Sequence, residues 1–161
     1  MEYTDFFKLM YFKYICTEID CGRTQCYLQS DGWAIFIYDR FSMNWTAAYS
    51  ACVSKGMSLA MPKTSNTYTL IRQILLKFNP SPNQNEYWMG LSRNKFGSSL
   101  TWIDGTALGD FHPWYSGNNY SPTMNCVKFI YEQDNRFRWL DEDCSYVNQV
   151  YPVCEHTYTL S

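Results

Sequence analysis

Cysteine spacing is the feature that most constrains how this chain of 161 residues can fold. Four of its seven cysteines lie far apart in the sequence, beside segments with the patterns of strands or a helix: Cys52, Cys126, Cys144 and Cys154. Such spacing is typical of disulfides, which persist in oxidising compartments and are reduced in the cytosol. We therefore expect a disulfide-stabilised protein that is secreted or lies on the extracellular face of the cell surface.

The other three cysteines, Cys16, Cys21 and Cys26, recur at every fifth residue. This Cys-x4-Cys-x4-Cys pattern is compatible with zinc, but zinc takes four ligands, and the two histidines, His112 and His156, are far away in the sequence. Disulfides are therefore favoured over zinc here as well. Because seven is an odd number, one thiol is left free or pairs with another chain.

The composition indicates one folded domain and argues against a nucleic-acid-binding protein. Apolar residues make up 46% of the chain, and its length suffices for one domain with a core. The net charge is −2 and no run of Lys or Arg is present, which argues against binding to phosphates. The aromatic share of 19% suits a sheet-rich core and a surface on which Tyr and Trp make contacts.

No export signal or membrane anchor is visible in the sequence. Charged residues interrupt the segment 1–15, so it does not form an apolar signal core, and no segment approaches the length of a membrane span. We expect the sequence to be a fragment, a mature form with an added Met, or a gene model that lacks its first exon.

The pattern along the chain predicts an α+β domain. An apolar run at 33–38 is followed by a helix that Asn44 can cap and that Gly56 ends. A second helix follows Thr64, with apolar residues at i, i+3, i+4 and i+7 from Ile71. Strand patterns then occur at 87–91, 100–103, 126–131, 137–140 and 150–155.

One segment of 21 residues, 105–125, has no apolar period and carries scattered Gly, Pro, Asn and Tyr. Loops of this length are uncommon in compact domains and are usually functional. We therefore expect the binding function to reside in this loop.

Short tryptophan and cysteine motifs follow one another along the chain in a fixed order. They are Trp-x2-Ala-x3-Cys at 45–52, Trp-Met-Gly-Leu at 88–91, Trp-Ile-Asp-Gly at 102–105, Trp-Tyr-Ser-Gly at 114–117, Cys-Val at 126–127, Trp-Leu-Asp-Glu-Asp-Cys at 139–144 and Val-Cys-Glu at 153–155. In this order they resemble the C-type lectin-like domain. The resemblance implies two helices packed on antiparallel sheets, with a long irregular loop that binds ligands.

The resemblance also implies domain boundaries and core residues. The domain spans 32–156, after an N-terminal cysteine-containing extension at 1–31 and before a C-terminal tail at 157–161. Trp88 and Trp102 are expected in the core, because large aromatic side chains are mostly packing elements.

Two disulfides are implied by the resemblance, Cys52–Cys154 and Cys126–Cys144. The first ties the first helix to the last strand, and the second lies at the base of the long loop. Members with an extended N-terminus carry a further cysteine just before Tyr38, where this chain has Ile37. We therefore expect one pair among the upstream cysteines, and the third is available for a disulfide-linked dimer.

Sugar-binding members hold calcium in the long loop, where carboxylates and amides supply most of the oxygens. Their Glu-Pro-Asn or Gln-Pro-Asp motif falls here on 118–120, which lacks both the carboxylate and the proline. Their Asn-Asp pair falls on Leu140 and Asp141, and leucine has no oxygen to offer. A rearranged calcium site would have to use Asp141, Glu142 and Asp143, which we interpret as a solvated turn. We therefore expect neither a cofactor nor a resident metal.

The loop still carries side chains suited to recognition of a protein or of a sugar face. The candidate ligand-binding residues are Trp114, Tyr115, Asn118, Asn119, Tyr120 and, beside the loop, Asp141. Phe111 and Trp114 are alternatively a small core of the loop itself. The triplets at 44–46 and 119–121 match the N-glycosylation pattern and make Asn44 and Asn119 glycosylation candidates, although Pro122 weakens the second.

Catalysis has little support in the sequence, because Asp110 and His112 resemble only part of a charge relay and a histidine in a loop is usually solvated. No nucleophile elbow, metal-binding helix pair or glycine-rich phosphate loop is present, and a glycosidase needs two opposed carboxylates in a cleft. We expect an extracellular recognition module, and no enzyme, that binds a protein or glycoprotein ligand through the long loop independently of calcium. The alternative is a carbohydrate-binding C-type lectin with an altered calcium and sugar site.

Overall fold

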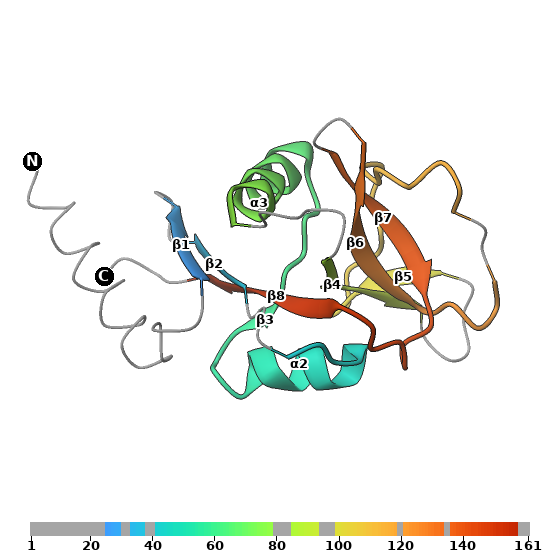
Figure 1. Ribbon diagram of the computed structural model, residues 1–161, viewed down its shortest axis with the longest axis horizontal. Coiled ribbons are helices and arrows are strands. Elements are labelled where there is room, and N and C mark those ends of the chain that lie inside the picture. The colour runs from blue at the N-terminus through green and yellow to red at the C-terminus, as the bar shows by residue number, and fades with distance from the viewer. Residues whose placement is uncertain are drawn as a thin grey trace, which may run out of the picture.

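The computed structural model describes residues 25–29, 33–37, 41–78, 85–93, 99–118, 121–133 and 136–157. Along this part of the chain, strands and two helices follow one another as the α+β prediction requires (Figure 1). The elements are β1 (Gln25–Gln29), β2 (Trp33–Ile37), α2 (Trp45–Val53), β3 (Ser58–Leu59), α3 (Ser65–Phe78), β4 (Glu86–Arg93), β5 (Leu100–Trp102), β6 (Cys126–Glu132), β7 (Arg136–Glu142) and β8 (Val150–Thr157).

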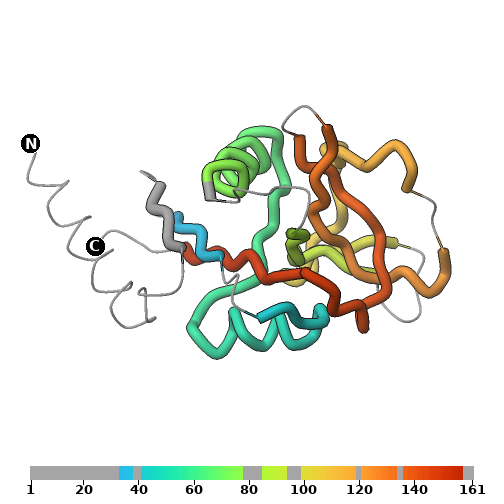
Figure 2. Tube along the Cα trace, in the orientation of Figure 1, coloured from blue at the N-terminus to red at the C-terminus, as the bar shows by residue number. Residues whose placement is uncertain are grey.

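The strands form one sheet in the order β1-β2-β8-β4-β6-β7, with β3 paired to β8 and β5 paired to β4. All pairs are antiparallel except β4 and β8, which run parallel. The last strand therefore joins the first hairpin to the strands that carry the long loop. Figure 2 shows this strand in red, running through the middle of the molecule between the two helices.

Both helices begin where the sequence predicts. The side chain of Asn44 accepts a hydrogen bond from the backbone N–H of Ala47 at 2.8 Å, which satisfies one of the free donors at the start of α2. Gly56 follows the helix with a φ of +71°, a conformation that costs glycine little. Thr64 accepts from the N–H of Thr67 at 3.2 Å at the start of α3.

The core divides between the two faces that the helices cover. Ala48 and Cys52 of α2 are fully buried against one cluster, and Ile71 and Leu75 of α3 against the other. The tryptophans of the two strand motifs, Trp88 and Trp102, are buried, so the prediction that they are core residues is confirmed.

Two strands were not predicted from the sequence. β3 is only two residues long, and β1 lies within the segment 1–31 that the sequence suggests as an extension. β1 pairs with β2 from Gln25 opposite Ile37 to Gln29 opposite Trp33, so the sheet already includes residues before position 32. Cys16 and Cys21 lie outside the described residues.

Candidate functional site

Two disulfides hold the framework on which the long loop is built, and they join the pairs that the resemblance implies. Cys52 is bonded to Cys154 with their Cα atoms 5.5 Å apart, across a sequence separation of 102 residues. A crosslink that closes a loop of this size stabilises the fold by about 4–5 kcal/mol in the chain-entropy account. Cys126 is bonded to Cys144 with a Cα distance of 5.1 Å, which ties the end of the loop to the segment after β7.

The start of the loop is a tight turn. Gly105 has a φ of +85° and donates its N–H to the carbonyl of Trp102 at 2.8 Å. Asp104 accepts hydrogen bonds from the backbone and hydroxyl of Thr106 at 3.1 and 2.7 Å and also pairs with Lys63. The Lys63 ammonium first, and then Thr106, lower the pKa of Asp104 to about 2. The loop therefore leaves the sheet in a fixed direction.

The middle of the loop lies along β7. The N–H of Trp139 donates to the carbonyl of Pro113 at 3.0 Å, and the N–H of Tyr115 donates back to Trp139 at 2.9 Å. The rings of Phe111 and Trp114 each meet the indole of Trp139 edge to face, with centroid distances of 5.9 and 5.7 Å. Phe111 and Trp114 thus form a small core of the loop, and only part of Trp114 remains exposed for a ligand.

Tyr115 lies at the edge of this core. Its ring covers Gly117 closely, because a Cβ atom added there would lie 2.7 Å from Cε1 of the tyrosine. The carbonyl of Tyr115 accepts the N–H of Asn118 at 3.0 Å, and Oδ1 of Asn118 accepts the N–H of Asp141 at 3.2 Å. The structure therefore brings Trp114, Tyr115, Asn118 and Asp141 together, whereas Asn119 and Tyr120 lie outside the described residues.

Asp141 is buried, so the expectation of a solvated turn at this residue is wrong, and its contact with a ligand stays a prediction. Its side chain is 2% exposed, and its Oδ2 atom lies 3.0 Å from Nη2 of Arg93 at the end of β4. The cause is the alternation of β7, in which Phe137, Trp139 and Asp141 all point into the molecule. The burial of the carboxylate depends on the guanidinium opposite it, since an unpaired charge is costly inside a protein.

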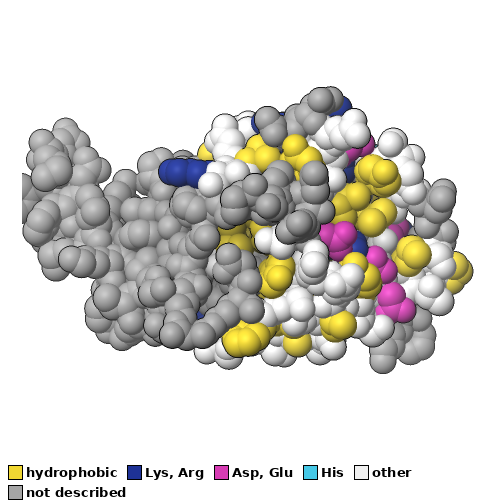
Figure 3. Space-filling model, viewed as in Figure 1, with side chains coloured by type: hydrophobic (Ala, Val, Ile, Leu, Met, Phe, Trp, Pro, Cys, Tyr) yellow, Lys and Arg dark blue, Asp and Glu magenta, His cyan; other side chains and the backbone are white. Residues whose placement is uncertain are grey.

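Glu142 also forms an ion pair, with Lys128. Lys128 is 2% exposed, forms ion pairs with Glu86 and Glu142, and lies 3.9 Å from the centre of the Tyr146 ring. The Nζ–Oε2 distance to Glu142 is 2.8 Å. On the face of the molecule seen in Figure 3, acidic side chains lie among apolar and uncharged ones.

Asp143 alone matches the expected solvated turn. Its Oδ1 atom accepts hydrogen bonds from the backbone N–H and the hydroxyl of Ser145, at 2.8 and 2.7 Å. These hydrogen bonds lower the pKa of Asp143, the backbone one most. The three acidic residues therefore have three different sets of partners, and they do not converge on one point. In the described ranges no three His, Cys, Asp or Glu side chains gather as metal ligands.

Sequence reasoning missed the two cations of the site. Lys128 stands within the apolar segment 126–131, and a lysine in such a strand is a signal for nearby carboxylates. No sequence pattern indicates that Arg93 belongs to the site, because its partner Asp141 is 48 residues away in the sequence.

With the disulfides, the motif tryptophans and the loop in place, the comparisons with known proteins identify the family. The model of the Lectin C-type domain matches residues 41–156, and the chain belongs to this family. Its members are in general binding modules that are typically extracellular or at the cell surface, which fits the two disulfides.

A curated relative and two solved structures illustrate the range of this family. C-type lectin domain family 3 member A of Bos taurus is 24% identical over 143 residues, which is 89% of this chain and 65% of that protein, so the chain spans less than two thirds of the relative's length. The C-type lectin domain of murine dendritic cell inhibitory receptor 2, solved in complex with N-glycan, has a TM-score of 0.67 and 18% identity, covering 82% of this chain and all of that one.

The second solved structure is a calcium-independent type II antifreeze protein. It has a TM-score of 0.64 and 21% identity, and the match covers 82% of this chain and 91% of that one. At this level of identity both structures support the fold alone. Within the described residues, neither helix has the length and apolar character that crossing a membrane requires.

Proposed function

We propose that the protein is an extracellular recognition module that binds a protein or glycoprotein ligand through the loop at 105–125 and does so without calcium. The observation that carries this proposal is the ion pair between Arg93 and Asp141. A buried carboxylate whose charge a guanidinium already neutralises is a poor calcium ligand, because the positive charge of the arginine repels a second cation at the same site.

The neighbouring carboxylates support the same conclusion. Glu142 is held by Lys128, and Asp143 is committed to the turn at Ser145. Calcium takes about six to eight oxygens. To supply oxygens for calcium from these three carboxylates, the protein would have to break two ion pairs and the hydrogen-bonded turn between Asp143 and Ser145.

The loop supports recognition because its base and its middle are both fixed. The Cys126–Cys144 disulfide holds the end of the loop, and the hydrogen bonds between 113–115 and Trp139 hold the middle. A loop fixed in this way presents Tyr115 and the exposed His112 and Ser116 without losing much conformational entropy when a ligand binds.

Calcium titration by calorimetry tests the calcium-free part of the proposal. We expect no saturable heat from millimolar calcium and no change in melting temperature between calcium and EDTA. Tight binding that EDTA reverses would instead support the alternative, a carbohydrate-binding lectin with a rearranged site.

A ligand screen tests the recognition part. The probes are an array of glycans and an array of extracellular protein domains, each used with calcium and with EDTA. Binding that persists in EDTA and is lost in Tyr115→Ala, but not in the matched variant Tyr49→Ala on α2, is the expected result. Equal effects of the two tyrosine variants would place the contact elsewhere.

A further inference from the structure

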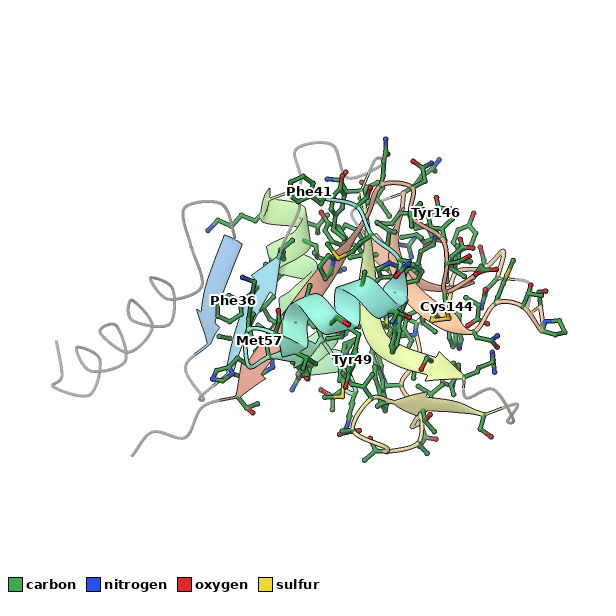
Figure 4. The ribbon with its side chains drawn as sticks, turned by 90° about the horizontal axis from the view of Figure 1, so that it is seen from below. Phe36, Phe41, Tyr49, Met57, Cys144 and Tyr146 are labelled. Carbon is green, nitrogen blue, oxygen red and sulfur yellow. A yellow bond between two sulfur atoms is a disulfide. The ribbon has the colours of Figure 1, made fainter. Side chains whose placement is uncertain are left out.

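The outer side of α2 presents an uncharged, partly apolar surface to solvent. The segment 41–54 contains no Asp, Glu, Lys, Arg or His. Along α2, the ring of Tyr49 stacks on Trp45 at a centroid distance of 5.8 Å and an interplanar angle of 4°, and Val53 follows one turn later. Tyr49 is 38% and Val53 48% exposed. Figure 4 shows α2 crossing the side of the molecule that faces the viewer.

Such a surface needs an explanation, because exposed apolar residues that lie next to one another mark a contact or a risk of aggregation. Residues with small side chains surround it: Thr46, Ala47 and Ser50 are exposed on the same helix. Because the residues around Tyr49 and Val53 are small and uncharged, a bulky neutral group can lie against this side of α2 without a steric clash or an unpaired charge.

We propose that Asn44 carries an N-linked glycan and that its first sugars cover this uncharged side of α2. The triplet Asn44-Trp45-Thr46 has the acceptor pattern. This triplet lies at the start of α2, the helix whose apolar side chains are exposed. This proposal does not depend on the ligand of the long loop.

The geometry of Asn44 is compatible with the modification. The residue is extended, with φ −70° and ψ 167°, and only its Oδ1 atom caps the helix, by accepting the N–H of Ala47. The cap uses only the Oδ1 atom, so within the described residues it leaves the Nδ2 amide, the atom that takes the sugar, available. Thr46, whose hydroxyl the acceptor pattern requires, is exposed.

The transfer balances with a lipid diphosphate-linked oligosaccharide as the donor. A bond forms between the anomeric carbon and Nδ2 of Asn44, the bond from that carbon to the diphosphate oxygen breaks, and Nδ2 loses one proton. Oδ1 is untouched, so the cap of α2 persists in the glycoprotein. Sugar rings can then pack their C–H groups on the aromatic pair Trp45 and Tyr49, whose ring faces carry negative charge density.

A matched pair of variants tests the modification. The full chain is secreted from eukaryotic cells behind a heterologous signal peptide, and glycopeptides are mapped by mass spectrometry. The wild type and Thr46→Ser, which keeps the acceptor pattern, should carry a glycan on Asn44, and Thr46→Ala should lose it. Thr46 is exposed and alanine favours helices, so neither variant should unfold α2. An unmodified Asn44 in the secreted wild type would overturn the proposal.

Covering of α2 is tested on the same samples by dye binding and light scattering. Peptide N-glycosidase F provides a second route to the bare protein, because it converts Asn44 to Asp, which caps helices equally well. The bare forms should bind more of the apolar dye ANS or associate with rising concentration, and the additional change Val53→Thr should reverse this. Equal ANS binding by glycosylated and bare protein, or a glycosylated dimer that Val53→Thr dissociates, would show that the sugar does not cover this side.

Discussion

The Nη2 atom of Arg93 lies 3.0 Å from the Oδ2 atom of Asp141, so a guanidinium from β4 neutralises the carboxylate that the family resemblance associates with calcium. Both side chains are nearly enclosed, at 12% and 2% exposure, and the Oδ1 atom of Asp141 has no hydrogen-bond partner in the part of the chain that the structure describes. The ion pair therefore holds a buried charge in place at the edge of the candidate site.

Replacing Arg93 by Met should lower the free energy of unfolding by about 3–5 kcal/mol, because it leaves the charge of Asp141 buried without a partner. Urea denaturation of the purified protein measures this loss. The double variant Arg93→Met with Asp141→Leu should recover most of it, since a buried ion pair and an apolar pair of similar volume are often of similar stability.

The matched control is Arg138→Met. Arg138 pairs with Glu132 at 2.9 Å, but both side chains are more than a fifth exposed. Removal of such a pair costs about 0–1 kcal/mol. If Arg93→Met destabilised the protein no more than Arg138→Met, the ion pair at Asp141 would contribute no more to stability than an exposed pair.

The fold could be predicted from the sequence where local signals and packing agree. Asn44 and Gly56 mark the ends of α2, and the period from Ile71 marks α3, because capping and one-sided burial depend on neighbours in the sequence. β3 was beyond prediction, because two residues carry no period. It exists through pairing with β8, where Leu59 lies opposite Cys154.

The candidate site was predicted less well, and Asp141 shows why. Three successive acidic residues suggest a solvated turn, and only the continuation of the alternation Phe137, Trp139, Asp141 reveals that the first of them points inward. The partner that makes this burial tolerable, Arg93, comes from another strand. No pattern within either segment indicates that the two will meet.

Glu155 should make stability fall as the pH rises. Its carboxylate is buried beside Trp33, whose Nε1 donates to Oε2 at 3.0 Å, and burial raises the pKa of Glu155 above the ordinary value of 4.5. The folded state then binds the proton more tightly than the unfolded state. Stability from this group is complete below pH 4.5 and is lost as the pH rises through the folded pKa.

The variant Glu155→Gln tests this, because glutamine can still accept the Trp33 hydrogen bond and does not ionise. The difference in unfolding free energy between variant and wild type should grow in favour of the variant from pH 4 to pH 7. Thermal unfolding across that range measures it. A constant difference would mean that Glu155 does not titrate differently on folding.

Gly90 should tolerate no side chain. A Cβ atom there would lie 2.9 Å from the carbonyl oxygen of Leu59 and equally close to Cδ1 of Ile103, in the interior where β4 meets β3. Gly90→Ala should therefore destabilise the protein by about 1–3 kcal/mol through overpacking. Gly109, with nothing within 4 Å of such an atom, is the matched control, and Gly109→Ala should leave the urea midpoint nearly unchanged. Equal midpoints for the two variants would contradict the close approach at Gly90.

Lys128 should contribute more to stability than any exposed lysine of the described chain. Lys128 lies on β6, and its ammonium pairs with Glu86 of β4 on one side and with Glu142 of β7 on the other. The lysine side chain is almost fully enclosed. Lys128→Met keeps the volume of the side chain but leaves two carboxylates near each other without their shared cation. Because both carboxylates keep some contact with water, we expect a loss of about 2–3 kcal/mol, short of that for a fully buried pair.

The comparison for this prediction is Lys63→Met, which breaks the exposed pair with Asp104. That variant should lose about 0–1 kcal/mol. Adding Glu142→Gln to Lys128→Met should restore part of the stability, because it removes the repulsion between the two carboxylates. Equal losses for Lys128→Met and Lys63→Met would show that the two ion pairs of Lys128 stabilise the protein no more than an exposed pair does.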